Sequence, residues 1–277
     1  MLKLEDFAPL RSALEEKLGT SLDAMESAPV PVLASAQRSL ASRPLWALRW
    51  GSRGLVSVRE EWVEPLQAVV NGLALDELFS IFGVYELSKI TLSDGVAVWG
   101  PSMYYFGDER TLRPPLEAGV QQFAVEELRK TIDCEIFWHC SLDEAITGFG
   151  VVEAGEIVAL AVVVPTFEQI WEIGMEVAPH AKGRGLGRAV VGAAGRWIVQ
   201  HERLVMATVA PWNIPSSRTL RSVGLNYVLM SMDTLSGHFH VPPQPLGHPR
   251  PGEDLYNHYP DWAMNQDIQP RPGGGIQ

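Results

Sequence analysis

The sequence predicts a mixed α+β fold: a mostly antiparallel sheet flanked by helices, joined to a smaller N-terminal α/β region. Two β-rich runs, 146–152 and 157–164, lie on either side of Ala154-Gly155, which is the pattern of an antiparallel hairpin. A third run, Ile170–Val177, is closed by Pro179 and leads into a glycine-rich turn. An apolar stripe at helical spacing then extends from residue 187 to about residue 201.

The N-terminal part has weaker patterns. Leu10, Leu14 and Leu18 recur at helical spacing, residues 76–79 open a short amphipathic run, and residues 95–101 have the pattern of a short strand that ends in a turn. Because Pro114-Pro115 forms a natural break, we predict three regions. These are an N-terminal extension domain (1–117), a main domain (118–240) and a Pro/Gly-rich tail (241–277) that is too poor in apolar residues to fold.

The other elements of the main domain follow from periodicity and from turn residues. We expect a helix over 120–133, a strand over 204–209, a helix over 216–223 that Gly224 stops, and a last strand over 227–232.

The composition indicates which classes of binding partner are to be expected. The 277 residues include 33 acidic and 22 basic ones, which gives a formal charge of −11. Nucleic acid and anionic membrane surfaces attract the opposite sign, so neither is an expected partner. The two cysteines, Cys134 and Cys140, have no zinc-ligand spacing, and no segment resembles a secretory leader or a membrane span. We therefore expect a metal-free protein of a reducing compartment, the cytoplasm.

The segment that predicts chemistry is the basic, glycine-rich turn after Val177. Its residues from Lys182 onward are Gly183, Arg184, Gly185, Leu186, Gly187 and Arg188. Glycines allow close approach of a ligand, and the first turn of a helix leaves N–H donors without internal partners. With the positive end of the helix dipole, these donors form a site suited to a pyrophosphate.

Known nucleotide fingerprints do not fit this turn. In G-x-G-x-x-G, counted from Gly183 or Gly185, the third glycine position holds Arg188 or Val190, and no Walker-type loop is present. The upstream hairpin is also not a βαβ unit, which disfavours a nucleotide-dependent oxidoreductase. A tight strand–helix turn without any ligand is the alternative interpretation of the turn taken alone.

A second motif, Asn213-Ile214-Pro215-Ser216, follows one strand later and precedes a helix that ends at Gly224. Together, the hairpin, the strand, the glycine loop, the helix, the next strand and this Asn-x-x-Ser motif resemble the GNAT superfamily of acyl-CoA N-acyltransferases over residues 118–240. Two positions depart from the family pattern: Lys182 replaces an Arg or Gln, and Leu225 replaces an aromatic residue.

The resemblance implies a splayed strand pair with the pantetheine arm of acetyl-CoA between the strands. The backbone of Met175, Glu176 and Val177 would contact the arm and supply an oxyanion donor, and the N–H groups of residues 183–188 would hold the pyrophosphate. Asn213 and Ser216 would contact the arm; the alternative for Asn213 is a turn or helix-start residue. The extension would cover one side of the acceptor site or derive from a second copy of the fold.

Transfer to an amine needs a base, for which a carboxylate with a raised pKa is suited. Glu172 and Glu176 lie on the strand before the loop, where alternation places both on one face and Met175 and Val177 on the other. We expect Glu172 to be the base, with Glu176 as second choice; the alternative is that both flank the sheet in solvent or pair with Arg.

The proton donor is not identified by the sequence. The family's usual Tyr position holds Leu220, and neither Tyr104, Tyr105 nor Tyr227 matches the motif. The predicted function is direct transfer of an acetyl group to a small-molecule or peptide amine in a ternary complex; a homodimer is left open. The alternative is a non-catalytic acyl-CoA-binding or sensing protein.

Overall fold

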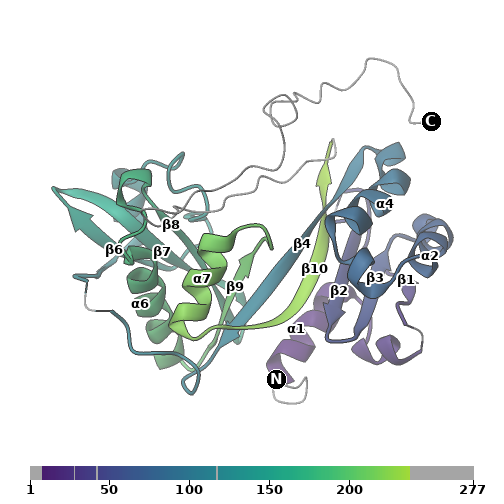
Figure 1. Cartoon of the computed structure of the whole chain (residues 1–277), viewed down its shortest axis with the longest axis horizontal. Coiled ribbons are helices and arrows are strands. Elements are labelled where there is room, and N and C mark those ends of the chain that lie inside the picture. The colour runs from purple at the N-terminus through teal and green to yellow at the C-terminus, as the bar shows by residue number, and fades with distance from the viewer. Residues whose placement is uncertain (1–7, 28, 42, 117, 238–277) are drawn as a thin grey trace, which may run out of the picture. The chain divides into compact units, whose positions relative to one another are not determined.

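The computed structural model describes residues 8–27, 29–41, 43–116 and 118–237 (Figure 1). The tail predicted for 241–277 lies outside these residues. The described part contains a ten-stranded sheet with the strand order β1-β3-β2-β10-β4-β9-β8-β7-β6-β5. The strands are β1 (Val32–Ala34), β2 (Leu45–Trp50), β3 (Arg53–Val58), β4 (Val96–Gly107), β5 (Gln121–Phe123), β6 (Thr147–Glu153), β7 (Glu156–Phe167), β8 (Ile170–Val177), β9 (Leu204–Val209) and β10 (Asn226–Ser236).

Helices flank this sheet. The α-helices are α1 (Ala8–Leu18), α2 (Val63–Asn71), α3 (Leu75–Leu78), α4 (Ile81–Thr91), α5 (Val125–Thr131), α6 (Leu186–Gln200) and α7 (Ile214–Val223), and short 3-10 turns lie between them. The pairs β1–β3 and β8–β9 are parallel and the other neighbouring pairs are antiparallel. The predicted fold class, a mostly antiparallel sheet flanked by helices, is confirmed.

Three predicted elements are wrong in extent, one of them the last strand, which was expected over 227–232 and spans Asn226–Ser236. The helix expected over 120–133 is divided: Gln121–Phe123 pairs with β6, and only Val125–Thr131 is helical. Phe123 is buried against the sheet. The conformation of this segment is therefore determined by tertiary strand pairing, although the local periodicity suggested a helix. The strand expected to end at Pro101 continues to Gly107, because β9 and β10 pair with it on both sides.

The two long strands β4 and β10 link the predicted extension to the main domain. They lie side by side between the two groups of helices in Figure 1, with β2 on the far side of β10 and β9 on the far side of β4. The sheet is therefore continuous across the predicted boundary at residue 117.

The ladder between β8 and β9 is short. The two strands pair at Ile170–Leu204, Trp171–Val205 and Glu172–Met206, and no later pair follows among the described residues. Each strand keeps its other neighbour: β8 pairs with β7 as far as Val177, and β9 pairs with β4 as far as Val209. The carboxyl-terminal halves of β8 and β9 are thus parted within the sheet.

The core divides by the face of the sheet. Ile173 and Val177 belong to the cluster that packs against α6 and α7, with Met175 against its edge. On the other face, one cluster lies under α1 and includes Trp46, Tyr104 and Ile170. A second cluster on that face lies under α5 and the chain after it.

Candidate active site

The glycine-rich turn begins α6. Gly183 and Gly185 have φ values of +79° and +80°, a region that L side chains rarely adopt. A Cβ built on Gly183 has open space around it, and one on Gly185 would meet only Leu116 at 3.9 Å. Residues 182–185 are exposed. The turn therefore presents its backbone to solvent without an obstructing side chain.

The first turn of α6 supplies donors to this surface. The amide of Ala189 donates to the carbonyl of Gly185 (3.2 Å), so the amides of Leu186, Gly187 and Arg188 lie before it at the N-terminal end of the helix. Gly187 also allows the helix to approach β8, since a Cβ there would lie 2.8 Å from the Cε of Met175. Positive partial charge is concentrated at this end of the helix.

The charged side chains of the turn are partly neutralised by carboxylates. Arg184 forms a bidentate pair with Glu153 on β6 (2.8 and 2.5 Å). The ammonium of Lys182 lies 3.7 Å from Glu176 and is half exposed. Arg184 is thus directed to the β6–β7 hairpin, while Lys182 and Arg188 remain around the donors of α6.

Between the parted halves of β8 and β9 lies a gap in the sheet, and backbone groups of β8 face this gap at alternate residues. The amide of Ala178 donates to Val158 on the β7 side, whereas the carbonyl of Gln169 accepts from Leu204 on the β9 side (both 2.9 Å). Because this direction alternates along a strand, even-numbered residues of β8 face β7 and odd-numbered residues face β9. The N–H and C=O groups of Ile173, Met175 and Val177 consequently point into the gap; the Val177 amide also contacts Oε1 of Glu176 (3.3 Å).

Polar side chains from five neighbouring strands form a row at the point where β8 and β9 part. Thr208 donates to Glu172 (2.7 Å), and Thr166 donates to its other oxygen (3.3 Å). Thr208 is in register with Tyr104, and Ser231 donates to the Tyr104 hydroxyl (3.2 Å). We call Ser231, Tyr104, Thr208, Glu172 and Thr166 the polar row.

The middle of the polar row is open to solvent. Thr208 and Thr166 are exposed and Glu172 is partly exposed, although β9 and β8 are inner strands of the sheet. Burial raises the pKa of Glu172, and the hydrogen bonds from Thr208 and Thr166 and the charge of Lys17 only partly offset this effect. The Glu172 carboxylate is thus a stronger base than an ordinary glutamate.

Glu176 lies in a different environment on the same face. Its carboxylate is 2.6 Å from Nδ1 of His139, whose ring packs 3.5 Å from the ring of the exposed Trp138. Burial acts to raise the pKa of Glu176, but the hydrogen bond with His139 and the nearby positive charges outweigh it, so the pKa is lowered. Of the two predicted carboxylates, only Glu172 has the pKa shift that a base needs.

Asn213 and Ser216 begin α7. The Oδ1 of Asn213 accepts a hydrogen bond from the amide of Ser216 (3.2 Å), so the side chain of Asn213 acts as an N-cap. Leu220, at the family's usual Tyr position, is buried in the core under α6. No tyrosine hydroxyl reaches the gap from that position of α7.

Several residues of the site were not predicted. Tyr104, Thr208 and Ser231 join the polar row through strand register, which a single sequence does not reveal. Lys17 of α1 reaches the same row, 3.5 Å from the Tyr104 hydroxyl. His139, which the sequence did not single out, is a partner of Glu176. The only signal available was the pair of tyrosines at 104 and 105.

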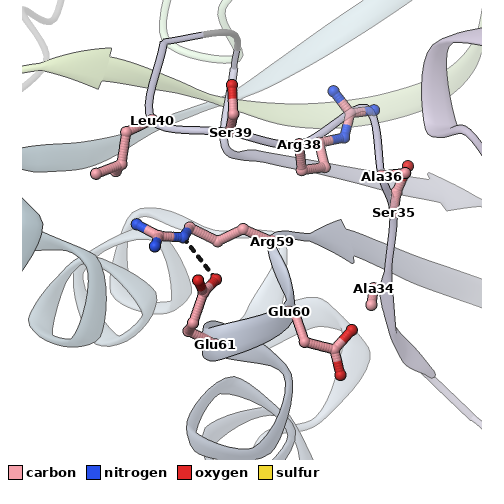
Figure 2. A pocket seen from close by; sticks show the side chains of 9 residues that line it. All are labelled: Ala34, Ser35, Ala36, Arg38, Ser39, Leu40, Arg59, Glu60 and Glu61. Atoms are coloured by element: carbon pink, nitrogen blue, oxygen red, sulfur yellow. Dashed lines mark hydrogen bonds and ion pairs between the residues drawn. The ribbon is translucent and has the colours of Figure 1, made fainter.

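A surface pocket of about 640 Å³ lies elsewhere, between β1, β3 and the 3-10 turn Glu60–Trp62 (Figure 2). Three of its charged side chains have partners within the protein: Arg59 pairs with Glu61 (2.9 Å), and the Nε of Arg38 donates to Ser57 (3.1 Å). We assign no chemistry to this pocket.

Comparison with known proteins agrees with the geometry of the loop and the parted strands. Residues 113–225 match the family described as Acetyltransferase (GNAT) family. This part of the chain thus has the sequence pattern of a GNAT acetyltransferase domain. Acyl transfer from an acyl-CoA to a small molecule or peptide is the reaction class of that family.

Solved structures with similar folds are distant in sequence. A Novosphingobium aromaticivorans protein assigned to the GNAT family is 15% identical over 52% of this chain and 68% of its own, with a TM-score of 0.43. A GNAT-family acetyltransferase from Colwellia psychrerythraea is 14% identical over 51% and 58% (TM-score 0.40). A GCN5-related N-acetyltransferase from Kribbella flavida is 17% identical over 54% and 63% (TM-score 0.37). The chain thus spans less than two thirds of the last two relatives.

No curated protein matches the chain. None of the helices in the described ranges is long and apolar enough to cross a membrane.

Proposed function

We propose that the protein is an acetyl-CoA-dependent N-acetyltransferase that transfers the acetyl group directly to an amine in a ternary complex. The observation that carries the proposal is the end of the β8–β9 ladder at Glu172 and Met206. The carboxylate of Glu172, whose pKa is raised, lies at this point, and the same strand, β8, leads into the loop that begins α6.

Each part of the donor has a matching group. The pyrophosphate suits the amides of residues 183–188, the dipole of α6 and the side chains of Lys182 and Arg188. Beside the gap, Met175 and Val177 offer backbone groups that can pair with the amides of the pantetheine arm. Asn213 and Ser216 begin α7, the element that follows β9 in the chain, and would contact the arm from the β9 side of the gap. The thioester then lies near Glu172.

The reaction removes two protons from the acceptor nitrogen and delivers one proton to the leaving sulfur. Glu172 takes a proton from the ammonium of the acceptor, directly or through a water, and the neutral nitrogen attacks the thioester carbon. An amide of the Met175–Val177 segment stabilises the oxyanion. The C–S bond then breaks, and the attached nitrogen gives up its second proton, which a water passes to the thiolate of CoA, because Leu220 supplies none.

Replacement of Glu172 tests this role. We expect Glu172→Gln to lower kcat by about 10²- to 10⁴-fold, the usual contribution of a positioned base, while acetyl-CoA binds with unchanged affinity. Release of free thiol from a panel of amines measures kcat, and calorimetry measures the affinity. Glu176→Gln is the matched control on the same strand; an equal loss in both variants would contradict the assignment of Glu172.

A second candidate, a non-catalytic acyl-CoA sensor, is favoured by the buried Leu220. It predicts that the wild-type protein binds acetyl-CoA but releases no thiol with any amine. The panel above therefore separates the two functions.

A further inference from the structure

Lys17 places a positive charge beside the polar row. Its Nζ lies 3.5 Å from the Tyr104 hydroxyl and 4.7 Å from the centre of the Trp46 ring. Nearby, Arg43 and Asp233 pair with each other at 3.0 Å. Among the residues that the structure describes, Lys17 has no ion pair, although its side chain is largely buried. An ammonium without an ion pair is energetically costly at a largely buried position, and burial therefore lowers the pKa of Lys17.

The fold holds this lysine in position. The carbonyl of Lys17 accepts a hydrogen bond from the guanidinium of Arg38, and the carbonyl of Leu18 accepts one from Ser57 (2.6 Å). Both donors are buried, and Arg38 itself is bonded to Ser57. Figure 2 shows Arg38 at the edge of the pocket there. The last turn of α1 is therefore fixed to β3, and Lys17 with it.

Lys17 and Glu172 contact the same polar row, Lys17 at Tyr104 and Glu172 at Thr208. Tyr104, which Lys17 contacts, is on β4; Glu172 is on β8, with only β9 between the two strands. Tyr104 is in register with Thr208, and Glu172 is in register with Met206, two residues earlier on β9. With strands about 4.8 Å apart and a rise of about 3.3 Å per residue, these side chains arise about 12 Å from each other. The exposed Thr208 lies between them. A short ligand with one group at Glu172 can therefore present a second group to Lys17.

We propose that Lys17 binds a carboxylate of the acceptor, so that the acceptor is a compact amino acid, with its amine at Glu172 and its carboxylate at Lys17. This inference rests on the proposed function for the position of the amine. An anionic group supplies the ion pair that Lys17 does not form within the described part of the chain, since an ammonium and a carboxylate form a charge-assisted hydrogen bond. Other charges that act on Lys17 are those of Asp233, Arg43, Glu172 and Arg38, and none of these forms an ion pair with it.

Matched pairs of substrates test the proposal. Phenylalanine with phenethylamine, leucine with isoamylamine, and lysine with cadaverine differ only in the carboxylate. We expect the wild-type protein to favour the amino acid of at least one pair. Lys17→Met should lower kcat/KM for that amino acid by about 10- to 100-fold, the usual effect of losing a bond to a charged group, and leave the amine unchanged.

Two further variants keep the test decisive. Lys17→Arg preserves the charge and should retain the preference, whereas Lys89→Met removes an exposed lysine of α4 that pairs with Glu86 and should change nothing. An equal loss for both members of each pair would show that Lys17 only supports Trp46. That result, or a wild-type preference for the decarboxylated amines, overturns the proposal.

Calorimetry separates this proposal from the proposed function. If acetyl-CoA binds but no amine is acetylated, the catalytic assignment fails, and the amino acids are titrated into the CoA complex instead. Binding to the wild-type protein that is lost in Lys17→Met then supports carboxylate recognition. Equal binding to both proteins, or no binding to either, overturns it.

Discussion

Glu172 is unfavourable for the stability of the protein and well suited to its proposed chemistry. Strand alternation predicted from the sequence that Glu172 and Glu176 share a face, and the structure places them so. The sequence could not rank their pKa values, because the groups that set them are distant in the chain: Thr208 beside Glu172 and His139 beside Glu176. For the same reason, the sequence did not indicate that Lys17 and Tyr104 lie at the site.

The raised pKa of Glu172 has a consequence for stability. Its pKa is higher in the folded than in the unfolded protein, so its contribution is complete below the unfolded value of about 4.3 and is lost as the pH rises through the folded value. We therefore expect Glu172→Gln to raise the Tm at pH 7–8. The gain should shrink toward pH 4, where Glu172 is protonated in both states.

Thermal unfolding at a series of pH values measures this difference between variant and wild type. Glu176→Gln should behave in the opposite way, because the folded pKa of Glu176 is lowered: its contribution is present above the unfolded value and is lost as the pH falls. A Glu172→Gln protein that is less stable than wild type at pH 8 would contradict the raised pKa.

Among the elements, the turn before α6 was the most predictable. Its glycines, its position after β8 and the helix that follows were all expected from the sequence, and the strand bounds Ile170–Val177 are confirmed. Elements set by tertiary pairing were not: β5 replaces the first turn of an expected helix, and β4 is twice as long as its local pattern suggests.

A charge in this turn should abolish the binding of acetyl-CoA. Gly185→Glu introduces a side chain at a φ of +80° and a negative charge beside the pyrophosphate donors. A ligand at 100 times its Kd adds about 2.7 kcal/mol of stability to the wild-type protein, and we expect the variant to lose this shift. Differential scanning fluorimetry with acetyl-CoA measures it.

Gly95 provides a matched control for the strain. It has a φ of +73° and open space around its Cβ position, but it lies at the start of β4, away from the turn. Gly95→Glu should therefore keep the full stabilisation by acetyl-CoA. A folded Gly185→Glu protein with the same shift as Gly95→Glu would refute the anion site.

On the scale of the whole molecule, the division at residue 117 remains a prediction. The single sheet crosses it, because β4 pairs with β9 and β10, and β10 pairs with β2. The sequence suggested two domains because of a proline pair and because the secondary-structure patterns are clearer after it than before it. It contains no sign that a strand before the boundary is an inner strand of the sheet.

A truncated chain tests what this continuity means for folding. We expect residues 118–240 alone to show no cooperative unfolding transition, since removal of β4 leaves β9 and β10 without their shared partner and exposes Tyr227 and Leu229. Residues 1–246 should unfold in one transition. Circular dichroism during heating compares the two, and a stable, cooperative 118–240 fragment would mean that the extension is dispensable to the fold.

Amide hydrogen exchange, resolved by residue, tests most directly whether the parted strands receive the donor. On addition of CoA, exchange should slow at Met175 and Val177, which face the gap, and at residues 183–188. Exchange at Gly174 and Glu176, which face β7, should change little. If calorimetry shows that CoA binds while Met175, Val177 and the turn exchange as before, the donor lies elsewhere and the account is wrong.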